Sequence, residues 1–425
     1  MRPVTVLYVH HRPELGGAPT SLYHLLGALD RERFRPVVLC PKGDTAALFA
    51  SAGVPVYPGP ISTFSHVVTC TYHGLRWAML ARELAWAAPH ARVVARLVRQ
   101  ERAAVVHLNE GNLMLAAWVA RLSGARVVWH FRGMLAEGHR GRRRRLVRAC
   151  LARWGDAVIA IDSGVAGPLA DLPNLQIVHN SVDLGSFQQA DGDAVRRELG
   201  IPPDAPVAGM VGRVRTEEGS LDFLRAAAHL QAKLPQAHFL LVGGGARSPA
   251  FFRTAEGRLL LAAGLIRDEL ADAQALAARL GLAKVRFVPF RPDAAAVYAA
   301  LDVVVTGGEA GIGRQALEAA AAGRPIVAAS RRPVPDLVVE GETGYLVPPG
   351  DSAALADRLH ALLAPPACGG YPARRAAMGS AARALAEERF DPAANAARIM
   401  AIYDRLLAPR EAGARSAGPV PGASR

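Results

Sequence analysis

The sequence predicts an α/β protein made of two doubly wound domains that face each other across a cleft. Two series of short apolar or β-branched runs, separated by segments of helix length, indicate alternating strands and helices. A polar, proline-rich passage at residues 200–206, "GIPPDAP", separates the two series. The chain of 425 residues is long enough for two such domains, each with its own core.

The first series predicts an N-terminal domain over residues 1–187. Its six apolar runs are, in chain order, "VTVLYVHH", "RPVVLCPKG", "GVPVYPG", "AAVVHLNE", "ARVVWHFRG" and "DAVIAIDSG". Consecutive parallel strands need a crossover that is long enough for a helix, and the spacing of these runs provides it. We therefore expect one parallel sheet here.

The second series predicts a C-terminal domain over residues 188–409. Its runs are "VAGMVGRV", "AHFLLVGGG", "VRFVPF", "LDVVVTGG", "RPIVAAS" and "TGYLVPPG". We expect the final helix, in "DPAANAARIMAIYDRLL", to cross back over the join between the domains. Residues 410–425 lack periodicity and are predicted to be a flexible tail.

The segment at residues 303–330, "VVVTGGEAGIGRQALEAAAAGRPIVAAS", predicts a strand, a glycine-rich turn, a helix and a second strand. Open α/β sheets bind ligands at such turns. A helix from about Gly313 would direct unpaired N–H groups and its positive dipole end to the turn. Arg314 in the first turn opposes the dipole, so a bound anion would account for it. A buried turn with a solvated arginine explains the pattern equally well.

A second glycine turn follows the first predicted strand. Gly16 and Gly17 precede an amphipathic helix with its leucines turned inward. These leucines are Leu22, Leu25, Leu26 and Leu29. The turn is compatible with phosphate binding or with a tight strand-to-helix connection. No G-x-G-x-x-G follows the first strand and no G-x-x-x-x-G-K-[ST] occurs, which argues against dinucleotide redox chemistry and P-loop hydrolysis.

The positive charge of the chain is concentrated in its first half. The net charge is +13, and residues 1–190 hold 22 Arg and Lys against 12 Asp and Glu. An arginine-rich segment follows an apolar, Trp-containing stretch at residues 73–98. Such a patch suits anionic lipid, nucleic acid or a phosphorylated substrate, and a solvated helix face is the alternative. Its arginines are Arg140, Arg142, Arg143, Arg144, Arg145 and Arg148.

The cysteines predict a reduced cytosolic protein without structural zinc. Cys40, Cys70, Cys150 and Cys368 are widely spaced and form no C-x-x-C pair. The apolar run at residues 4–9 is too short for a signal peptide, and no run approaches the length of a membrane span. We expect a protein that touches a membrane at most.

Eight motifs resemble those of the retaining glycosyltransferase family 4, whose members have the GT-B architecture of two Rossmann-like domains. The motifs occur in family order between residues 15 and 351, and the order makes the resemblance specific. They are "LGGAPTSLYHLL", "VVHLNEGN", "WHFRG", "VHNSVDLGSF", "GMVGRVRTEEG", "FLLVGGG", "LDVVVTGGEAGIGRQALEAAAAGRPIVA" and "PVPDLVVEGETGYLVPPGD".

The resemblance implies transfer of a sugar from a nucleotide diphosphate sugar to a glycan or lipid-linked acceptor. The donor would bind the C-terminal domain and the acceptor the N-terminal one, without a metal or another cofactor. The implied role is in cell-surface polysaccharide or glycolipid synthesis. The implied location is the cytoplasm, with an anionic membrane surface as a possible partner at the inner face of the plasma membrane. No nucleic-acid partner is implied.

The resemblance also assigns roles to individual residues. Arg213 and the backbone at Ile312, Gly313 and Arg314 would hold the diphosphate. Glu318 would bind the ribose. The catalytic set would be His130, Glu309 and Arg213, and the loop at Gly16 and Gly17 would close on the phosphates. In the family, retention is usually explained by same-face attack, in which the leaving phosphate oxygen takes the acceptor proton.

The sequence departs from the family pattern in three places, and the first two favour a second interpretation. Glu218 stands where the family has a lysine, which reverses the charge beside the diphosphate. Glu309 and Glu318 are separated by eight residues instead of seven, and Arg332 precedes "PVPD" where the family has glycine. Arg332, Arg215 or Arg314 could replace the lysine. The alternative is a GT-B protein that binds nucleotide-sugar or glycan with little or no catalysis; a nucleotide-sugar epimerase is a more distant one.

Overall fold

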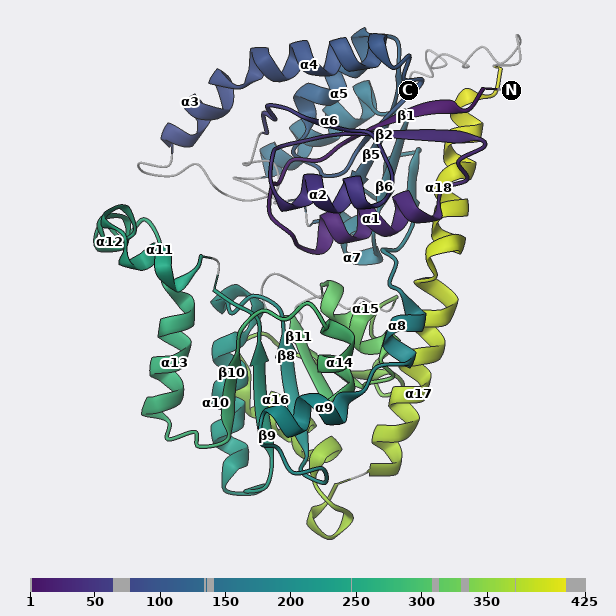
Figure 1. The fold of residues 1–425 in the computed structure, drawn as a ribbon. Coiled ribbons are helices and arrows are strands. Elements are labelled where there is room, and N and C mark those ends of the chain that lie inside the picture. Colours follow the sequence, from purple (N-terminus) through teal and green to yellow (C-terminus); the bar gives the residue numbers. More distant parts are fainter. Residues whose placement is uncertain are drawn as a thin grey trace, which may run out of the picture.

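The computed structural model describes most of both predicted domains (Figure 1). The described residues are 2–63, 77–133, 135, 141–245, 247–307, 313–329, 336–370 and 372–409. Several residues singled out from the sequence lie outside these ranges. They are Cys70, Arg140, Glu309, Ile312, Arg332 and the predicted tail, residues 410–425.

The N-terminal sheet has seven parallel strands in the order β3-β2-β1-β4-β5-β6-β7. Six of them are the predicted runs, and the short edge strand β7 was not predicted. The strands are β1 (Val4–Val9), β2 (Phe34–Cys40), β3 (Val56–Pro58), β4 (Val105–Leu108), β5 (Arg126–Phe131), β6 (Ala157–Ala160) and β7 (Leu175–Ile177).

The C-terminal sheet has six parallel strands in the order β10-β9-β8-β11-β12-β13. All six predicted runs form strands, so the predicted fold class is confirmed. The strands are β8 (Val207–Val211), β9 (His238–Val242), β10 (Val285–Val288), β11 (Val303–Gly307), β12 (Ile326–Ala329) and β13 (Gly344–Val347).

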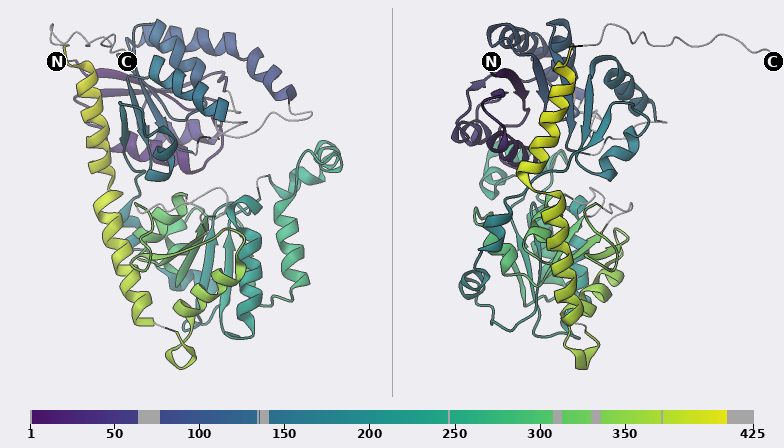
Figure 2. Two further views of the ribbon diagram at one scale, coloured as in Figure 1. Left: turned by 180° about the vertical axis from the view of Figure 1, so that it is seen from behind. Right: turned by 90° about the vertical axis from the view of Figure 1, so that its right-hand side faces the viewer.

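Helices cover both faces of each sheet (Figures 1 and 2). The helices up to residue 198 are α1 (Gly17–Ala28), α2 (Asp44–Ser51), α3 (Trp77–Ala85), α4 (Ala87–Gln100), α5 (Met114–Leu122), α6 (Arg142–Trp154), α7 (Ser163–Ala166), α8 (Leu184–Gln188) and α9 (Gly192–Glu198). The later helices are α10 (Ser220–Gln231), α11 (Pro249–Arg253), α12 (Ala255–Ala262), α13 (Glu269–Arg279), α14 (Ala294–Ala299), α15 (Arg314–Ala321), α16 (Ser352–Leu363), α17 (Pro372–Arg389) and α18 (Pro392–Leu407).

Alternate side chains of each strand enter different cores, as expected for a sheet covered on both faces. In β1, Leu7 and Val9 belong to one N-terminal core, while Val6 and Tyr8 belong to the core on the opposite face. The predicted inward face of α1 packs into that second core, where Leu22 and Leu26 are fully buried. Apolar burial on both faces is the main force that holds each sheet.

Helices α17 and α18 lead from the C-terminal domain back to the N-terminal domain (Figures 1 and 2). Helix α17 packs against α15 in the C-terminal half, and α18 packs against α1 in the N-terminal half. Asp391 caps α18 by accepting a hydrogen bond from the N–H of Ala394 at 2.7 Å, and Pro392 occupies the first turn. Ile399, Ile402 and Tyr403 are buried in the same core as Leu22 and Leu26. The final helix therefore completes the core of the first domain.

Within the described ranges, no helix combines the length and the apolar character that crossing a bilayer requires.

Replacing Ile402 with alanine tests the contribution of α18 to the N-terminal core. Ile402 is 1% exposed, so Ile402→Ala leaves a cavity and should lower the free energy of unfolding by about 2–5 kcal/mol. Urea unfolding monitored by tryptophan fluorescence measures the loss. Leu122→Ala is the control: Leu122 is 69% exposed, and its replacement should change stability by less than about 0.5 kcal/mol. Equal effects of the two variants would contradict this account of α18.

Candidate functional site

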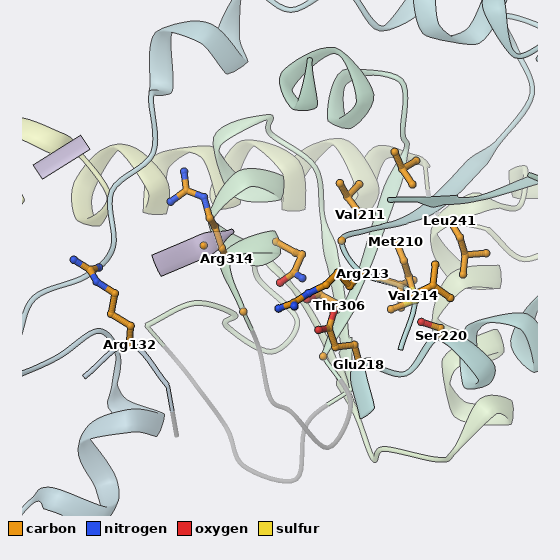
Figure 3. A pocket seen from close by; sticks show the side chains of 17 residues that line it. Arg132, Met210, Val211, Arg213, Val214, Glu218, Ser220, Leu241, Thr306 and Arg314 are labelled. Carbon is orange, nitrogen blue, oxygen red and sulfur yellow. The ribbon is translucent and has the colours of Figure 1, made fainter. Parts of the chain in front are cut away.

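A cavity of about 320 Å³ lies between the domains, where the carboxyl ends of strands from both sheets meet (Figure 3). Gly17 at the start of α1 and Arg132 just after β5 line it from the N-terminal side. The C-terminal side contributes the ends of β8, β9 and β11, a short 3-10 helix and the start of α15. These lining residues include Gly212, Arg213, Glu218, Ser220, Val242, Thr306, Gly307, Gly313, Arg314 and Gln315.

Glycines bring the ends of β8 and β9 close together beside this cavity. Gly243 has φ +139°, and a Cβ there would lie 1.9 Å from the carbonyl oxygen of Gly212. Gly212 itself has φ +143°, and a Cβ there would lie 2.7 Å from the side-chain nitrogen of Gln315. A side chain at either position would strain the backbone, and at Gly243 it would also clash with the backbone of Gly212. Glycine therefore leaves the ends of β8 and β9 open to a ligand.

The C-terminal side of the cavity offers two kinds of positive group. Helix α15 begins after Gly313, whose position at the N-cap provides no side-chain hydrogen bond to the first N–H groups. Arg213 is exposed, and the described residues include no ion pair to it. Figure 3 shows Arg213 and Glu218 together on the side of the cavity opposite Arg132. Unpaired N–H groups and a free guanidinium are suited to bind an anion.

Glu218 lines the cavity beside Arg213, so the reversed charge noted in the sequence lies next to the anion-binding groups. Burial raises the pKa of the Glu218 carboxyl, and the charges of Arg213 and Arg215 oppose that rise. Arg215 is itself engaged, since it forms ion pairs with Glu217 at 2.8 Å and Glu269 at 3.6 Å. Arg215 therefore carries no free charge that would replace the expected lysine.

Arg314 joins the two domains instead of presenting a free charge to the cavity. Its Nε donates to Glu318 at 2.7 Å, within one turn of α15. The other guanidinium nitrogens reach the hydroxyl of Ser21 at 3.1 Å, the carbonyl of Ser181 at 3.0 Å and the ring of His24 at 3.4 Å. The carboxylate that is expected to bind ribose thus already has a cationic partner, although a carboxylate accepts several hydrogen bonds.

Arg132 is a site residue that the sequence analysis missed. Its guanidinium donates to Asn109 at 2.6 Å and to the side chain of Asn180, and it lies 3.4 Å from His130 Nδ1. No ion pair to a carboxylate is found among the residues described, and burial lowers its pKa to about 9. The signal was available: Arg132 is in "WHFRG", directly after a strand, where ligands of α/β sheets bind.

His130 lies in β5, 1% exposed, and does not line the large cavity. It lines a smaller cavity that shares Arg132 with the large one and includes Asn180 and Ser181. His130 Nε2 is buried without a hydrogen-bond partner in the described part of the chain. Burial, with the charge of Arg132 second, lowers the pKa of His130 well below its usual value. The imidazole is therefore neutral at pH 7.

The glycine turn of α1 lies beside the site, whereas the described part of the arginine-rich segment, residues 142–148, does not line it. Gly16 is the N-cap of α1, and a Cβ at Gly17 would contact the Arg314 side chain at 3.7 Å. In α6, Arg148 pairs with Asp171, and Arg143 and Arg144 also have partners. Arg142 and Arg145 are exposed beside Leu146, which is 62% exposed.

A second contact between the domains covers the start of α7. Asp336 from the C-terminal domain accepts hydrogen bonds from the N–H of Ser163 at 2.7 Å and from the Ser163 hydroxyl. Asp162 caps the same helix by accepting from the N–H of Val165 at 2.7 Å. Burial raises the pKa of Asp162 to about 6; the Val165 hydrogen bond opposes this rise and the charge of Asp336 adds to it.

This raised pKa predicts a pH-dependent stability. The folded protein binds the Asp162 proton more tightly than the unfolded chain does, so stability falls as pH rises from about 4 to about 6. Asp162→Asn keeps a capping oxygen and removes the charge. It should stabilise the protein by roughly 1–3 kcal/mol at pH 8 and by much less at pH 4. Urea unfolding at both pH values measures this difference.

Asp191→Asn is the control for the Asp162 prediction. Asp191 caps α9 by accepting from the N–H of Asp193 at 2.8 Å and is exposed. Its replacement should give no stabilisation that grows with pH. If Asp162→Asn also gives none, the assigned pKa shift is wrong.

Two family models match the chain, one for each domain. The model for Glycosyltransferase Family 4 matches residues 15–186, and the model for Glycosyl transferases group 1 matches residues 205–365. Together they cover most of the N-terminal sheet and the whole of the C-terminal sheet.

Individual proteins show the same likeness. The D-inositol 3-phosphate glycosyltransferase of Mycobacterium avium is 34% identical over 245 residues, which is 56% of this chain and 51% of the relative. The protein of the same name from Streptomyces scabiei is 34% identical over 269 residues, covering 60% of this chain and 55% of the relative. The chain thus spans about half the length of the curated relatives it matches.

A solved structure matches nearly the whole chain. The crystal structure of Anabaena HepE in complex with UDP-glucose has a TM-score of 0.74 at 21% identity, covering 94% of this chain and 99% of HepE. At this identity the likeness concerns the fold. The two parallel sheets and the cavity between them have the GT-B arrangement, and with both family models matched, the chain belongs to the family 4, group 1 glycosyltransferases.

Proposed function

We propose that the protein is a retaining glycosyltransferase that moves a sugar from a nucleotide diphosphate sugar to a glycan or lipid-linked acceptor. The observation that carries the proposal is the cavity between the sheets, where Arg213 and the start of α15 offer positive groups to one anion. Its role would be in cell-surface polysaccharide or glycolipid synthesis, from the cytoplasmic side of the membrane.

The diphosphate is placed against the C-terminal side of the cavity. The glycines at the ends of β8 and β9 let it approach the backbone, and the first N–H groups of α15 and Arg213 stabilise its charge. Glu318 is the fifth residue of α15. It binds the ribose and keeps its hydrogen bond from Arg314. From the family resemblance, His130 and Glu309 are assigned to the donor sugar and the transferred centre.

Same-face transfer needs little from a protein base. The acceptor oxygen forms a bond to the anomeric carbon as the bond to the phosphate oxygen breaks, and that phosphate oxygen takes the acceptor proton. Charge builds on the leaving diphosphate, so groups that stabilise it lower the barrier. Arg213 and the α15 N–H groups supply this stabilisation, and the proposal therefore includes no metal or other cofactor.

A panel of nucleotide sugars tests this proposal directly. UDP-glucose leads the panel because the HepE structure contains it. An inositol phosphate is included among the acceptors because of the names of the relatives from Mycobacterium avium and Streptomyces scabiei. Thermal shift identifies the donor, and anomer-resolved product analysis tests retention. Inversion at the anomeric carbon would contradict the retaining mechanism, and binding without transfer would favour the alternative below.

Glu318→Ala should weaken binding of the preferred nucleotide-sugar by roughly tenfold or more, because a charged hydrogen-bond partner of the ribose is lost. Isothermal titration calorimetry measures the change. The control is Glu387→Ala, since Glu387 forms the same kind of pair with Arg383, four residues apart and 2.7 Å long, in α17 outside the cavity. Unchanged donor affinity in Glu318→Ala would show that the nucleotide is misplaced.

A binding protein with little or no catalysis is the second candidate, and Glu218 favours it. A carboxylate beside the diphosphate opposes the charge stabilisation that transfer requires. Glu218→Lys separates the two functions. In an active enzyme the change should alter turnover modestly, whereas in a protein that has lost activity it should create or raise turnover. A large loss of donor affinity in Glu218→Lys would contradict both interpretations, the active enzyme and the protein that has lost activity.

The exposed part of α6 is proposed to dock on an anionic membrane surface that carries the acceptor. Arg142 and Arg145 precede the exposed Leu146 on α6, and an arginine near such a surface contributes ~1 kcal/mol. Replacing both arginines with glutamine should weaken sedimentation with phosphatidylserine-containing liposomes by roughly tenfold or more. Added salt should have the same effect on the unmodified protein.

The matched control removes two exposed arginines from the other domain, Arg197 and Arg258. It makes the same change in net charge and should leave liposome binding close to that of the unmodified protein. Equal losses in both double variants would mean that net charge, not α6, determines binding. Equal binding by all three proteins would remove the docking proposal.

A further inference from the structure

A continuous row of polar side chains runs through the buried part of the N-terminal domain. The hydroxyls of Tyr8 and Tyr403 are 3.0 Å apart, and the Tyr403 hydroxyl lies 2.7 Å from Nδ1 of His107. Nε2 of His107 lies 3.1 Å from Nδ1 of His130, which in turn lies 3.4 Å from the guanidinium of Arg132. Three strands and the final helix contribute to this row.

The long contact from Arg132 at 3.4 Å indicates the direction of the hydrogens in the row, and the shorter bond from His107 at 3.1 Å maintains it. A guanidinium only donates, so Nδ1 of His130 is an acceptor. Nε2 of His107 must then donate to the same nitrogen. Burial lowers the pKa of His107 and of His130 well below the usual value, so each ring carries one proton. His107 Nδ1 is therefore bare and accepts from Tyr403, whose oxygen accepts from Tyr8.

The remaining proton of His130 has one possible place. With Nδ1 bare, the neutral ring carries its proton on Nε2. That nitrogen is buried without a partner among the described residues, and His130 lines the small cavity shared with Arg132 and Ser181. A buried donor normally has an acceptor, so this N–H is available to an oxygen atom of a bound ligand.

We propose that Tyr403 is a positioning residue that, through His107, holds His130 in the form with its proton on Nε2. His130 then offers a hydrogen-bond donor to an oxygen of the bound sugar or phosphate and cannot act there as a base. The assignment of that oxygen to substrate rests on the proposed transferase function. The tautomer itself rests on the hydrogen-bond row alone.

The proposal links the last helix of the chain to the candidate site. Tyr403 lies on α18, 296 positions from His107 in sequence. Its ring packs against Phe34 at a centroid distance of 5.4 Å, a contact that a phenylalanine would keep. Tyr403→Phe therefore removes only the hydroxyl that donates to His107.

Nitrogen NMR of histidine-labelled protein tests the tautomer. The signal of His130 is assigned by its loss in His130→Gln. In the unmodified protein we expect the shift of a protonated nitrogen at Nε2 and of a bare nitrogen at Nδ1, constant between pH 6 and 8. In Tyr403→Phe, His107 loses its donor and can turn its own proton to Nδ1. Nδ1 of His130 then keeps only the longer contact with Arg132 at 3.4 Å, so the protonated population at His130 Nε2 should fall.

Tyr8→Phe is the matched control. It removes a buried hydroxyl from the same row, but Tyr8 donates only to Tyr403, and Tyr403 can still donate to His107. The His130 signals should stay as in the unmodified protein. A proton on Nδ1 of His130 in the unmodified protein overturns the proposal, as do equal shifts in the two variants. If Tyr403→Phe does not fold, the unmodified protein still decides the tautomer.

Enzyme kinetics provide a second test of the role of Tyr403. With the donor identified by the nucleotide-sugar panel, Tyr403→Phe should lower kcat by up to roughly tenfold, while KM for the donor and the activity of Tyr8→Phe stay close to those of the unmodified protein. Unchanged kcat in Tyr403→Phe overturns the link to transfer. A protein that binds none of the nucleotide sugars fails the proposed function, and the NMR result remains separate from that failure.

Discussion

The guanidinium of Arg314 is the interaction on which the geometry of the site depends. It binds a carboxylate within its own helix, a hydroxyl and a ring on α1, and a carbonyl in the segment between the sheets. These partners belong to elements that face each other across the cavity. Because the side chain is only 14% exposed, water screens its charge little. Its contacts with Ser21 and His24 fix the position of α15 relative to α1.

Two other arginines near the cavity also have partners. Arg215 is paired with two glutamates, and Arg132 is held by two asparagines and a histidine. Arg213 and the start of α15 therefore remain as the described groups with unused capacity for an anion on the C-terminal side. The positive charge of the site therefore depends on where Arg213 and the start of α15 lie, not on how many basic residues are nearby.

Much of the fold could be predicted from the sequence because apolar runs and their spacing report the strands of a parallel sheet directly. Strand β7 (Leu175–Ile177) was not predicted, because three residues are too few to show a pattern. Its pairing with β6 depends on the tertiary structure. The close backbone approach at Gly212 and Gly243 was not predicted, because it depends on how β8 and β9 lie side by side.

Side-chain direction could not be read in the same way. Residue order places Arg314 beside an anion site, but its partners Ser21 and Ser181 lie more than a hundred residues away in the chain. The partnership of Tyr403 with His107 is equally distant in sequence. Such contacts depend on how the two halves meet. Motifs predict which residues gather at a cleft, and only the three-dimensional arrangement shows which of them are already bound to one another.

The return of α18 to the first domain has a consequence for synthesis. The strands of the N-terminal sheet are complete at residue 177, whereas α18 begins at residue 392. A ribosome adding ~5–20 residues per second needs roughly 10–40 s to cover that interval. During that time the apolar slot that receives Ile399 and Ile402 is unfilled. The N-terminal domain is thus synthesised first, but its core is completed last. The apolar surface that α18 will cover is where a chaperone would bind during translation.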